Sequence, residues 1–317
     1  MLSSRFIDAI RRVLLVVVVT AVSVVLWRNW DEVAPHLGSI SGQAWAIAII
    51  AALSSPALTM LGWRRVLADL GSPLPLGNAA GVFLVGQLGK YVPGSVWSVI
   101  VQTEMAARSG VPRRRTGVVG LITLAMALLT GALLGLPAVP ALVNLGESIS
   151  LALVGLACLA MVVALYPPFL NRAIDRLLRL IRREPLEHEL SGRAIITMAV
   201  WFILSWVCTG VAVWAFASDL AESSGSSAYL ALVCISGFAL ASAVGMLSIV
   251  LPAGVGIREA VLVILLAGLL TAPAATAVVI LARFLTVVAD VVWALVGWLW
   301  ARSHHLTPPQ PMTTRLR

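Results

Sequence analysis

Charged residues are scarce in this chain. Of its 317 residues only 11% are Asp, Glu, Lys or Arg, whereas an ordinary soluble domain carries about 25%. Hydrophobic residues make up 60% of the chain, and the mean hydropathy is +0.99. These values exclude an ordinary soluble domain and predict an all-α, polytopic membrane protein. The apolar runs do not alternate with polar residues, which argues against a transmembrane β-barrel.

Cysteine and histidine are also rare, and neither is arranged to hold a metal. The three cysteines, Cys158, Cys208 and Cys234, lie inside apolar runs and form no C-x-x-C pair. They are expected to be packed thiols, without a disulfide framework or a zinc site. The four histidines are scattered through loops and the tail without metal-ligand spacing. We therefore expect no metal and no other cofactor.

Catalytic motifs are missing as well. No Ser-His-Asp set, H-E-x-x-H or D-x-D-like acidic pair occurs in any loop. The stretch Gly86-x-x-Gly89-Lys90 lacks the four-residue spacing and the following Ser or Thr of a P-loop. No loop is long enough to form a soluble catalytic domain. The protein is therefore not expected to be an enzyme.

The positive charge has a topological explanation. The formal net charge is +8, but most of it is arginine flanking apolar segments, which encodes membrane orientation and does not indicate nucleic-acid binding. Arginines cluster at residues 5–12, 64–65, 108–115 and 172–193 and in the tail. The opposite loops, 28–42, 140–147 and 218–227, hold one arginine and five acids. The positive-inside rule thus predicts a plasma (inner) membrane protein with both termini in the cytoplasm.

Six apolar segments are predicted to cross the membrane, within a single domain of residues 1–302 that precedes a disordered cytoplasmic tail, 303–317. The predicted spans are about 12–28, 43–63, 117–139, 148–167, 194–217 and 274–300. The second of them should end at an interfacial Trp63. Residues 169–183 alternate apolar and arginine positions at a spacing of three and four, which predicts an amphipathic helix on the membrane surface. A lipid-sensing role and a solvated connector remain equally open for it.

Two further apolar stretches are interrupted by Pro and Gly next to charges. The first, Gly86 to Trp97, contains Lys90, the only lysine, and predicts a broken hairpin over 79–107 with arms too short to cross. The second has its bend at Pro252–Glu259 within 228–272, and its first arm is long enough to span. The fold predicted is thus about six spanning helices plus two broken or re-entrant hairpins, about eight membrane segments. Hairpins that open to opposite sides would suit an inverted-repeat transporter.

Six charged residues fall at membrane depth, where an unpaired charge costs at least about 2.5 kcal/mol. Three are positive and three negative, so we expect them to pair. Arg283 and Asp290, seven residues apart on one helix, share a face, and a purely structural ion pair is one interpretation. The helix restarts near Ser95 and Ile257 would present free N–H groups, which suit an anion such as a lipid phosphate. The six residues are Lys90, Glu104, Arg258, Glu259, Arg283 and Asp290.

The two interrupted stretches resemble the two signature stretches of the lysylphosphatidylglycerol synthase transmembrane-region family. That family includes the flippase-like membrane domain of the bacterial multiple peptide resistance factor. The resemblance covers the chain from about the first span to the last, without the cytosolic aminoacyl-transferase domain found in fused members. It implies a flippase-like bundle, but it does not transfer a substrate. The matching positions are Lys90, Tyr91, Pro93, Gly94, Gly254, Gly256, Arg258 and Glu259.

The function expected from these features is transport: flipping of a phospholipid or of a lipid-linked anionic headgroup. The hairpin residues, with Ser95 added to the matching positions, would bind the phosphate. Glu104, Glu259 and Asp290 are candidates to carry a coupling proton, or to form ion pairs with residues such as Arg283. Two alternatives stay open: a membrane-embedded lipid transferase, and a non-catalytic membrane partner of a separate lipid-modifying enzyme. The expected partners are membrane lipids with anionic headgroups.

Overall fold

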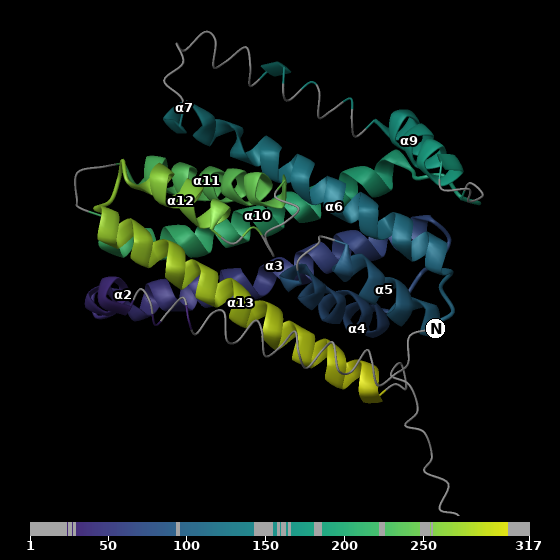
Figure 1. Cartoon of the computed structure of the whole chain (residues 1–317), viewed down its shortest axis with the longest axis horizontal. Coiled ribbons are helices and arrows are strands. Elements are labelled where there is room, and N and C mark those ends of the chain that lie inside the picture. Colours follow the sequence, from purple (N-terminus) through teal and green to yellow (C-terminus); the bar gives the residue numbers. More distant parts are fainter. Residues whose placement is uncertain are drawn as a thin grey trace, which may run out of the picture.

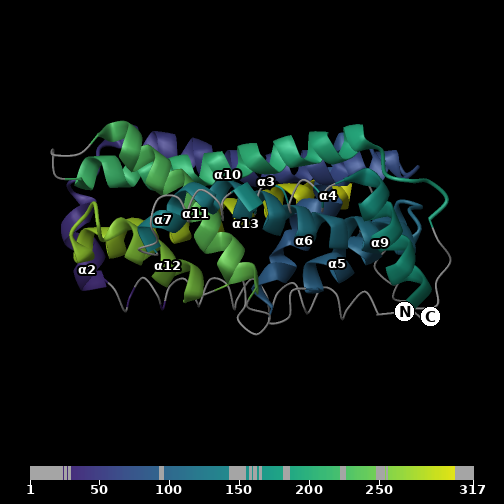
Figure 2. The same ribbon diagram turned by 90° about the horizontal axis from the view of Figure 1, so that it is seen from above.

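The long helices of the computed structural model lie side by side in one bundle (Figures 1 and 2). The structure describes residues 30–92, 96–142, 166–180, 186–221, 226–247 and 256–303, with Gly254 and the isolated residues 24, 27, 155, 156, 159 and 163. The predicted spans at 12–28 and 148–167 lie almost wholly outside this part, as does the predicted tail. Throughout the described ranges the secondary structure is helical, as predicted.

Five helices are long and apolar enough to cross a membrane: α3 (Gly42–Asp69), α6 with its short extension η2 (Arg113–Ala138), α10 (Gly192–Leu220), α11 (Ser227–Leu247) and α13 (Ala272–Ser303). At 1.5 Å per residue, α3 is about 42 Å long, more than the roughly 30 Å of a hydrocarbon core. Four of the five match predicted spans, and the fifth is the first arm of the second predicted hairpin. Large apolar side chains such as Ile50, Ile196 and Leu232 face outward, as contact with lipid requires.

The first broken hairpin has the predicted form. Helix α4 (Leu76–Gly86) passes into one turn of 3₁₀ helix, η1 (Gln87–Tyr91), and helix α5 (Trp97–Arg108) returns. The arms pack against each other so closely that a Cβ on Gly89 would lie 2.5 Å from the backbone nitrogen of Ser98. Glycine is therefore required at this position of the break. Neither arm is among the helices long enough to span.

The second hairpin is asymmetric. Its first arm, α11, has 21 residues, and its second arm, α12 (Ile257–Leu266), has only 10. Between them Gly254 and Gly256 have φ angles of 67° and 90°, a region that side-chain-bearing residues rarely adopt. The Cα of Gly245 on α11 lies only 2.9 Å from where a Cβ on Gly254 would stand. The two hairpins open toward opposite ends of the bundle (Figure 1).

Helices α3 and α10 form the most extensive helix pair, and they are joined at both ends by matching hydrogen bonds. Ser41 caps α3, and its N–H donates to Asp219 of α10 at 2.7 Å. Ser191 caps α10, and its N–H donates to Asp69 of α3 at 2.8 Å. Midway along the pair, the hydroxyls of Ser55 and Ser205 lie 2.7 Å apart. Two further helix pairs also pack extensively: α4 against α13, and α6 against α11.

Two apolar cores occupy the two halves of the bundle. One is built on the first half of α3, the second half of α10, α11, α12 and the first half of α13. The other combines the second half of α3 with α4, α6 and the first half of α10. A third, smaller cluster of Leu88, Tyr91, Val287 and Ala294 joins η1 to α13.

Three local predictions need correction. Trp63 is fully buried and its ring packs on Phe83 at 5.6 Å, so it is not an interfacial residue, and α3 continues past it to Asp69. The predicted loop 28–42 contains a short helix, α2 (Trp30–Leu37). The predicted loop 140–147 begins inside a further short helix, α7 (Val139–Leu142).

The predicted amphipathic helix exists as α9 (Pro167–Leu180), and its apolar stripe packs against the protein. Leu178 is buried, and Leu170 and Ile174 pack against the second core. The arginines at 172, 176 and 179 face outward. The amphipathic pattern is thus explained by packing on the protein, which satisfies the apolar stripe without lipid.

Candidate functional site

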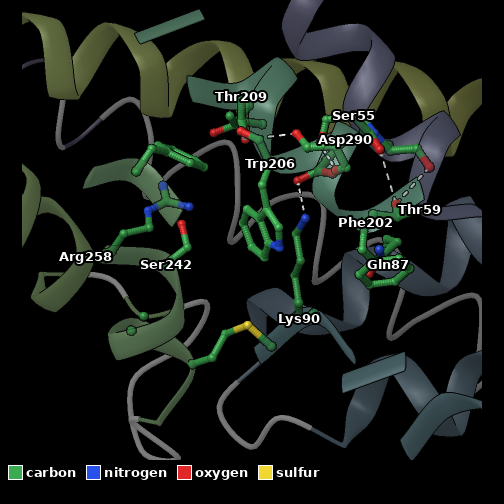
Figure 3. Close-up of a pocket in the computed structure, with 18 of the residues that line it drawn as sticks. Ser55, Thr59, Gln87, Lys90, Phe202, Trp206, Thr209, Ser242, Arg258 and Asp290 are labelled. Atoms are coloured by element: carbon green, nitrogen blue, oxygen red, sulfur yellow. Dashed lines mark hydrogen bonds and ion pairs between the residues drawn. The ribbon is translucent and has the colours of Figure 1, made fainter. Parts of the chain in front are cut away.

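A pocket of about 390 Å³ lies where the two breaks meet the long helices, and its lining is mixed in character. Such a volume falls within the usual range for small-molecule sites. The charged groups come from η1, α12 and α13, whereas α6 contributes mainly Leu124, Ala127 and Leu128. Figure 3 shows Lys90 and Arg258 reaching into it from opposite sides, with Trp206 between them in this view.

The pocket sits at the middle of four of the five long helices and at the C-terminal end of the fifth, α11. It touches α3 at 52–59, α6 at 123–128, α10 at 202–209 and α13 at 283–290. Each of these ranges is central in its helix. If the helices cross a bilayer, the pocket therefore lies near its midplane, where charged side chains are costly and usually functional.

Lys90 and Asp290 form the central ion pair. The ammonium Nζ lies 2.7 Å from Oδ2 of Asp290, and the hydroxyl of Tyr91 donates to the same oxygen at 2.6 Å. Asp290 is only 5% exposed, whereas the Lys90 side chain is 38% exposed. The two residues of the first break are thereby joined to the last helix, and Asp290 pairs with Lys90 and not with Arg283 of its own helix.

A second charged cluster stands at the other break. Glu259 contacts Arg258 at 3.2 Å and Arg283 at 3.7 Å through Oε1. Its other oxygen, Oε2, accepts the N–H of Gly256 at 2.7 Å and so caps α12. The start of α12 is therefore already occupied by a carboxylate of its own. The guanidinium groups of Arg258 and Arg283, not the helix N-terminus, are the groups this break offers to an anion.

Aromatic rings support these cations. The guanidinium of Arg258 lies 5.4 Å from the ring centre of Phe238, and that of Arg283 lies 5.8 Å from the ring of Tyr91. Such cation–π contacts stabilise a desolvated charge.

Hydroxyl groups complete the lining, and sequence reasoning missed them. Ser242 is the most informative, because its buried Oγ has no hydrogen-bond partner among the residues that the structure describes. A buried hydroxyl without a partner is costly, and in Figure 3 it lies beside Arg258. Other lining residues not singled out beforehand are Ser55, Thr59, Thr123, Phe202, Ser205, Trp206, Thr209 and Thr286.

The predicted site residues fall into three groups. The pocket brings together Lys90, Tyr91, Gly254, Arg258, Arg283 and Asp290. Gly256 and Glu259 are not part of its lining, and they are hydrogen-bonded to each other next to it. Pro93, Gly94 and Ser95 lie outside the described residues. Glu104 lies apart from the pocket: it forms two hydrogen bonds with Arg113, of 2.9 and 3.0 Å, at the end of α5.

No metal-binding group was found in the part of the chain that the structure describes, where no three His, Cys, Asp or Glu side chains converge. The carboxylates of the pocket region are each engaged with cations instead. The described lining can hold a ligand through charge and hydrogen bonds.

The helices and the pocket define the class: a multi-pass, all-helical membrane protein with a predominantly cationic pocket midway along its helices. The sequence profile described as "Lysylphosphatidylglycerol synthase TM region" matches residues 12–294. The chain belongs to this family, and the resemblance carried by its two interrupted stretches is confirmed. A search of curated proteins found no match.

Proposed function

We propose that this protein is a transporter that flips a phospholipid, or a lipid-linked anionic headgroup, across the plasma membrane, with both termini in the cytoplasm. The observation that carries the proposal is the convergence of both helix breaks on one pocket midway along the spanning helices. Broken helices that meet at the midplane are typical of transporter binding sites.

The charges of the pocket favour an anionic ligand. Its lining holds three cations, Lys90, Arg258 and Arg283, against one carboxylate, Asp290. Glu259, which lies outside the lining, pairs with Arg258 and so offsets a second positive charge. The remaining positive charge and the unpartnered hydroxyl of Ser242 suit the oxygens of a phosphate, which prefer charged donors.

The apolar part of the lining suits the rest of a lipid. On α6 the pocket is bounded by Leu124 and Leu128, and on α11 by Met246 and Phe238. A headgroup could bind the cations while the first carbons of its chains lie against these side chains. A free inorganic anion would gain nothing from that surface, since burying apolar area stabilises only an apolar partner.

We further propose that the bundle is an inverted repeat that relates α3–α6 to α10–α13. The reciprocal bonds of Ser41 with Asp219 and of Ser191 with Asp69 support it, because each residue is 150 positions from its counterpart. The packing supports it too: exchanging the halves converts the α4–α13 contact into the α11–α6 contact. A pocket between such repeats can open alternately to either side as one half rocks against the other.

A flipping assay in liposomes tests the function. Purified protein is reconstituted with a trace of chain-labelled fluorescent phosphatidylglycerol, and the label that reaches the inner leaflet is measured by its protection from a membrane-impermeant quencher. We expect wild type to exceed empty liposomes and Lys90→Ala and Arg258→Ala to lose about tenfold or more, since a charge-assisted hydrogen bond contributes about 1.5–3 kcal/mol.

Arg113→Ala is the matched control, because it removes a cation that pairs with Glu104 outside the pocket. Its rate should equal that of wild type. Flipping that is unchanged in both pocket variants would remove the proposed site, and no flipping by wild type of anionic or zwitterionic lipid would remove the proposed function.

A further inference from the structure

The three carboxylates at membrane depth have different surroundings, and only one can exchange its partner with a ligand. Glu104 is held by two hydrogen bonds from Arg113, away from the pocket. Glu259 is fixed by the N–H of Gly256 and by two arginines. Asp290 alone lines the pocket.

Among the residues that the structure describes, Asp290 forms an ion pair with a single cation, Lys90. The Oδ2 of Asp290 receives the ammonium of Lys90 at 2.7 Å and the neutral hydroxyl of Tyr91 at 2.6 Å. The Lys90 side chain is 38% exposed on a flexible stem, whereas Asp290 is 5% exposed. Lys90 can therefore turn toward a ligand in the pocket, while Asp290 cannot follow it into solvent.

The other groups around Asp290 do not replace Lys90. From α12, Arg258 is bound to Glu259, and on α13 itself Arg283 faces Glu259 and the ring of Tyr91. The lining residues from α3 and α10 add hydroxyls such as Ser55 and Ser205 but no titratable group, and those from α6 and α11 are likewise uncharged. Once Lys90 leaves, the hydrogen bond from Tyr91 is the one contact that Asp290 keeps among the described side chains.

We propose that a phosphate-bearing ligand takes Lys90 away from Asp290, and that Asp290 then takes up one proton from solution. A buried carboxylate without a cation is strongly disfavoured and neutralises instead. The proton adds to the Asp290 carboxylate, and no other bond is made or broken. This inference rests on the proposed function, because it names the coupling residue of the same site.

When the ligand is a phosphodiester, this exchange leaves the net charge of the site unchanged. One negative charge enters with the ligand, and one proton enters with it. Linkage then requires the ligand to bind more weakly as pH rises, approaching tenfold per pH unit when Asp290 is ionised without ligand and protonated with it. A proton gradient across the membrane could bias transport through the same residue.

Calorimetry of ligand binding in detergent tests the proposal. The probes are dihexanoyl phosphatidylglycerol and its deacylated headgroup, glycerophosphoglycerol, each titrated in buffers of different ionisation enthalpy. Because neither phosphodiester titrates near neutral pH, any proton uptake belongs to the protein. We expect wild type to take up about one proton per ligand, and Asp290→Asn to bind either probe without proton uptake and without pH dependence.

Glu104→Gln is the control and should take up one proton like wild type. Uptake by wild type of no proton, or equal uptake by a folded Asp290→Asn, would overturn the proposal while leaving the binding site intact. A wild-type count of zero overturns the proposal even if Asp290→Asn does not fold. Binding of neither probe would instead overturn the proposed function, and with it this inference. Binding of the lipid but not of the headgroup would show that the acyl chains are needed.

Discussion

Asp69 and Asp219 hold equivalent places at opposite ends of the α3–α10 pair, each accepting the backbone N–H of the serine that caps the other helix. A carboxylate at a helix N-terminus is favoured by the orphan N–H groups and by the helix dipole. The two contacts therefore fix the register of the two helices from both ends.

Replacing either aspartate should weaken the bundle, and replacing Asp69 by the larger amount, because Asp69 also accepts the hydroxyl of Ser191 at 2.9 Å and pairs with Arg65. We expect Asp69→Asn and Asp219→Asn each to cost about 0.3–1 kcal/mol, since a carboxylate at a helix N-terminus contributes about that much. Thermal unfolding of the purified protein in one detergent measures both. Asp175→Asn, in the interior of α9 and away from any helix N-terminus, serves as the control. A loss confined to one of the two aspartates would argue that the ends are not equivalent.

Gly89→Ala should disrupt the first break. The added Cβ would lie 2.5 Å from the nitrogen and 2.7 Å from the Cα of Ser98, and backbone atoms cannot turn aside as a side chain can. We expect a loss of about 1–3 kcal/mol or more, as for overpacked cores, together with lost flipping. Gly117→Ala is the matched control, because its Cβ would meet only the Thr103 hydroxyl at 4.0 Å. Equal melting temperatures for both variants would contradict the close approach of the arms.

Glu259→Gln should destabilise the second break far more than Glu104→Gln destabilises the first hairpin. Without Glu259, Arg258 and Arg283 remain 15% and 13% exposed with no carboxylate between them, and breaking a buried pair costs about 3 kcal/mol or more. The partner of Glu104, Arg113, is 54% exposed and can be hydrated when the pair is lost. Thermal unfolding of both variants beside wild type gives the comparison. Equal losses would mean that Glu259 is not the anchor of this cluster.

The breaks could be predicted from the sequence because their cause is local. Pro and Gly beside a charge within apolar sequence can form neither a straight helix nor a loop exposed to lipid. Another local signal, the length of the apolar runs, predicted four of the five long helices as spans. Local spacing also suggested pairing within a segment, of Arg283 with Asp290, because helix spacing is all that one segment reveals.

The actual partner of Asp290 lies 200 residues away, at Lys90, and no local pattern points to it. Nor did the apolar periodicity reveal the α3–α10 relationship. A signal was present in the sequence: Ser55 and Thr59 recur as Ser205 and Thr209, at the same 150-residue separation as the capping residues. It is weak because few positions between them are identical, and the packing of the two helices is what gives it meaning.

The hydroxyls of Ser55 and Ser205 meet where the two halves would exchange places, and either one can donate to the other. A contact of this kind has no preferred direction. An ion pair between the repeats would favour one tilt of the bundle over the other, whereas two like hydroxyls at the centre are satisfied equally in both. The Ser55–Ser205 contact would thus stabilise the two tilts of the bundle equally. The bound ligand and the charged residues at the breaks would then determine which tilt is favoured.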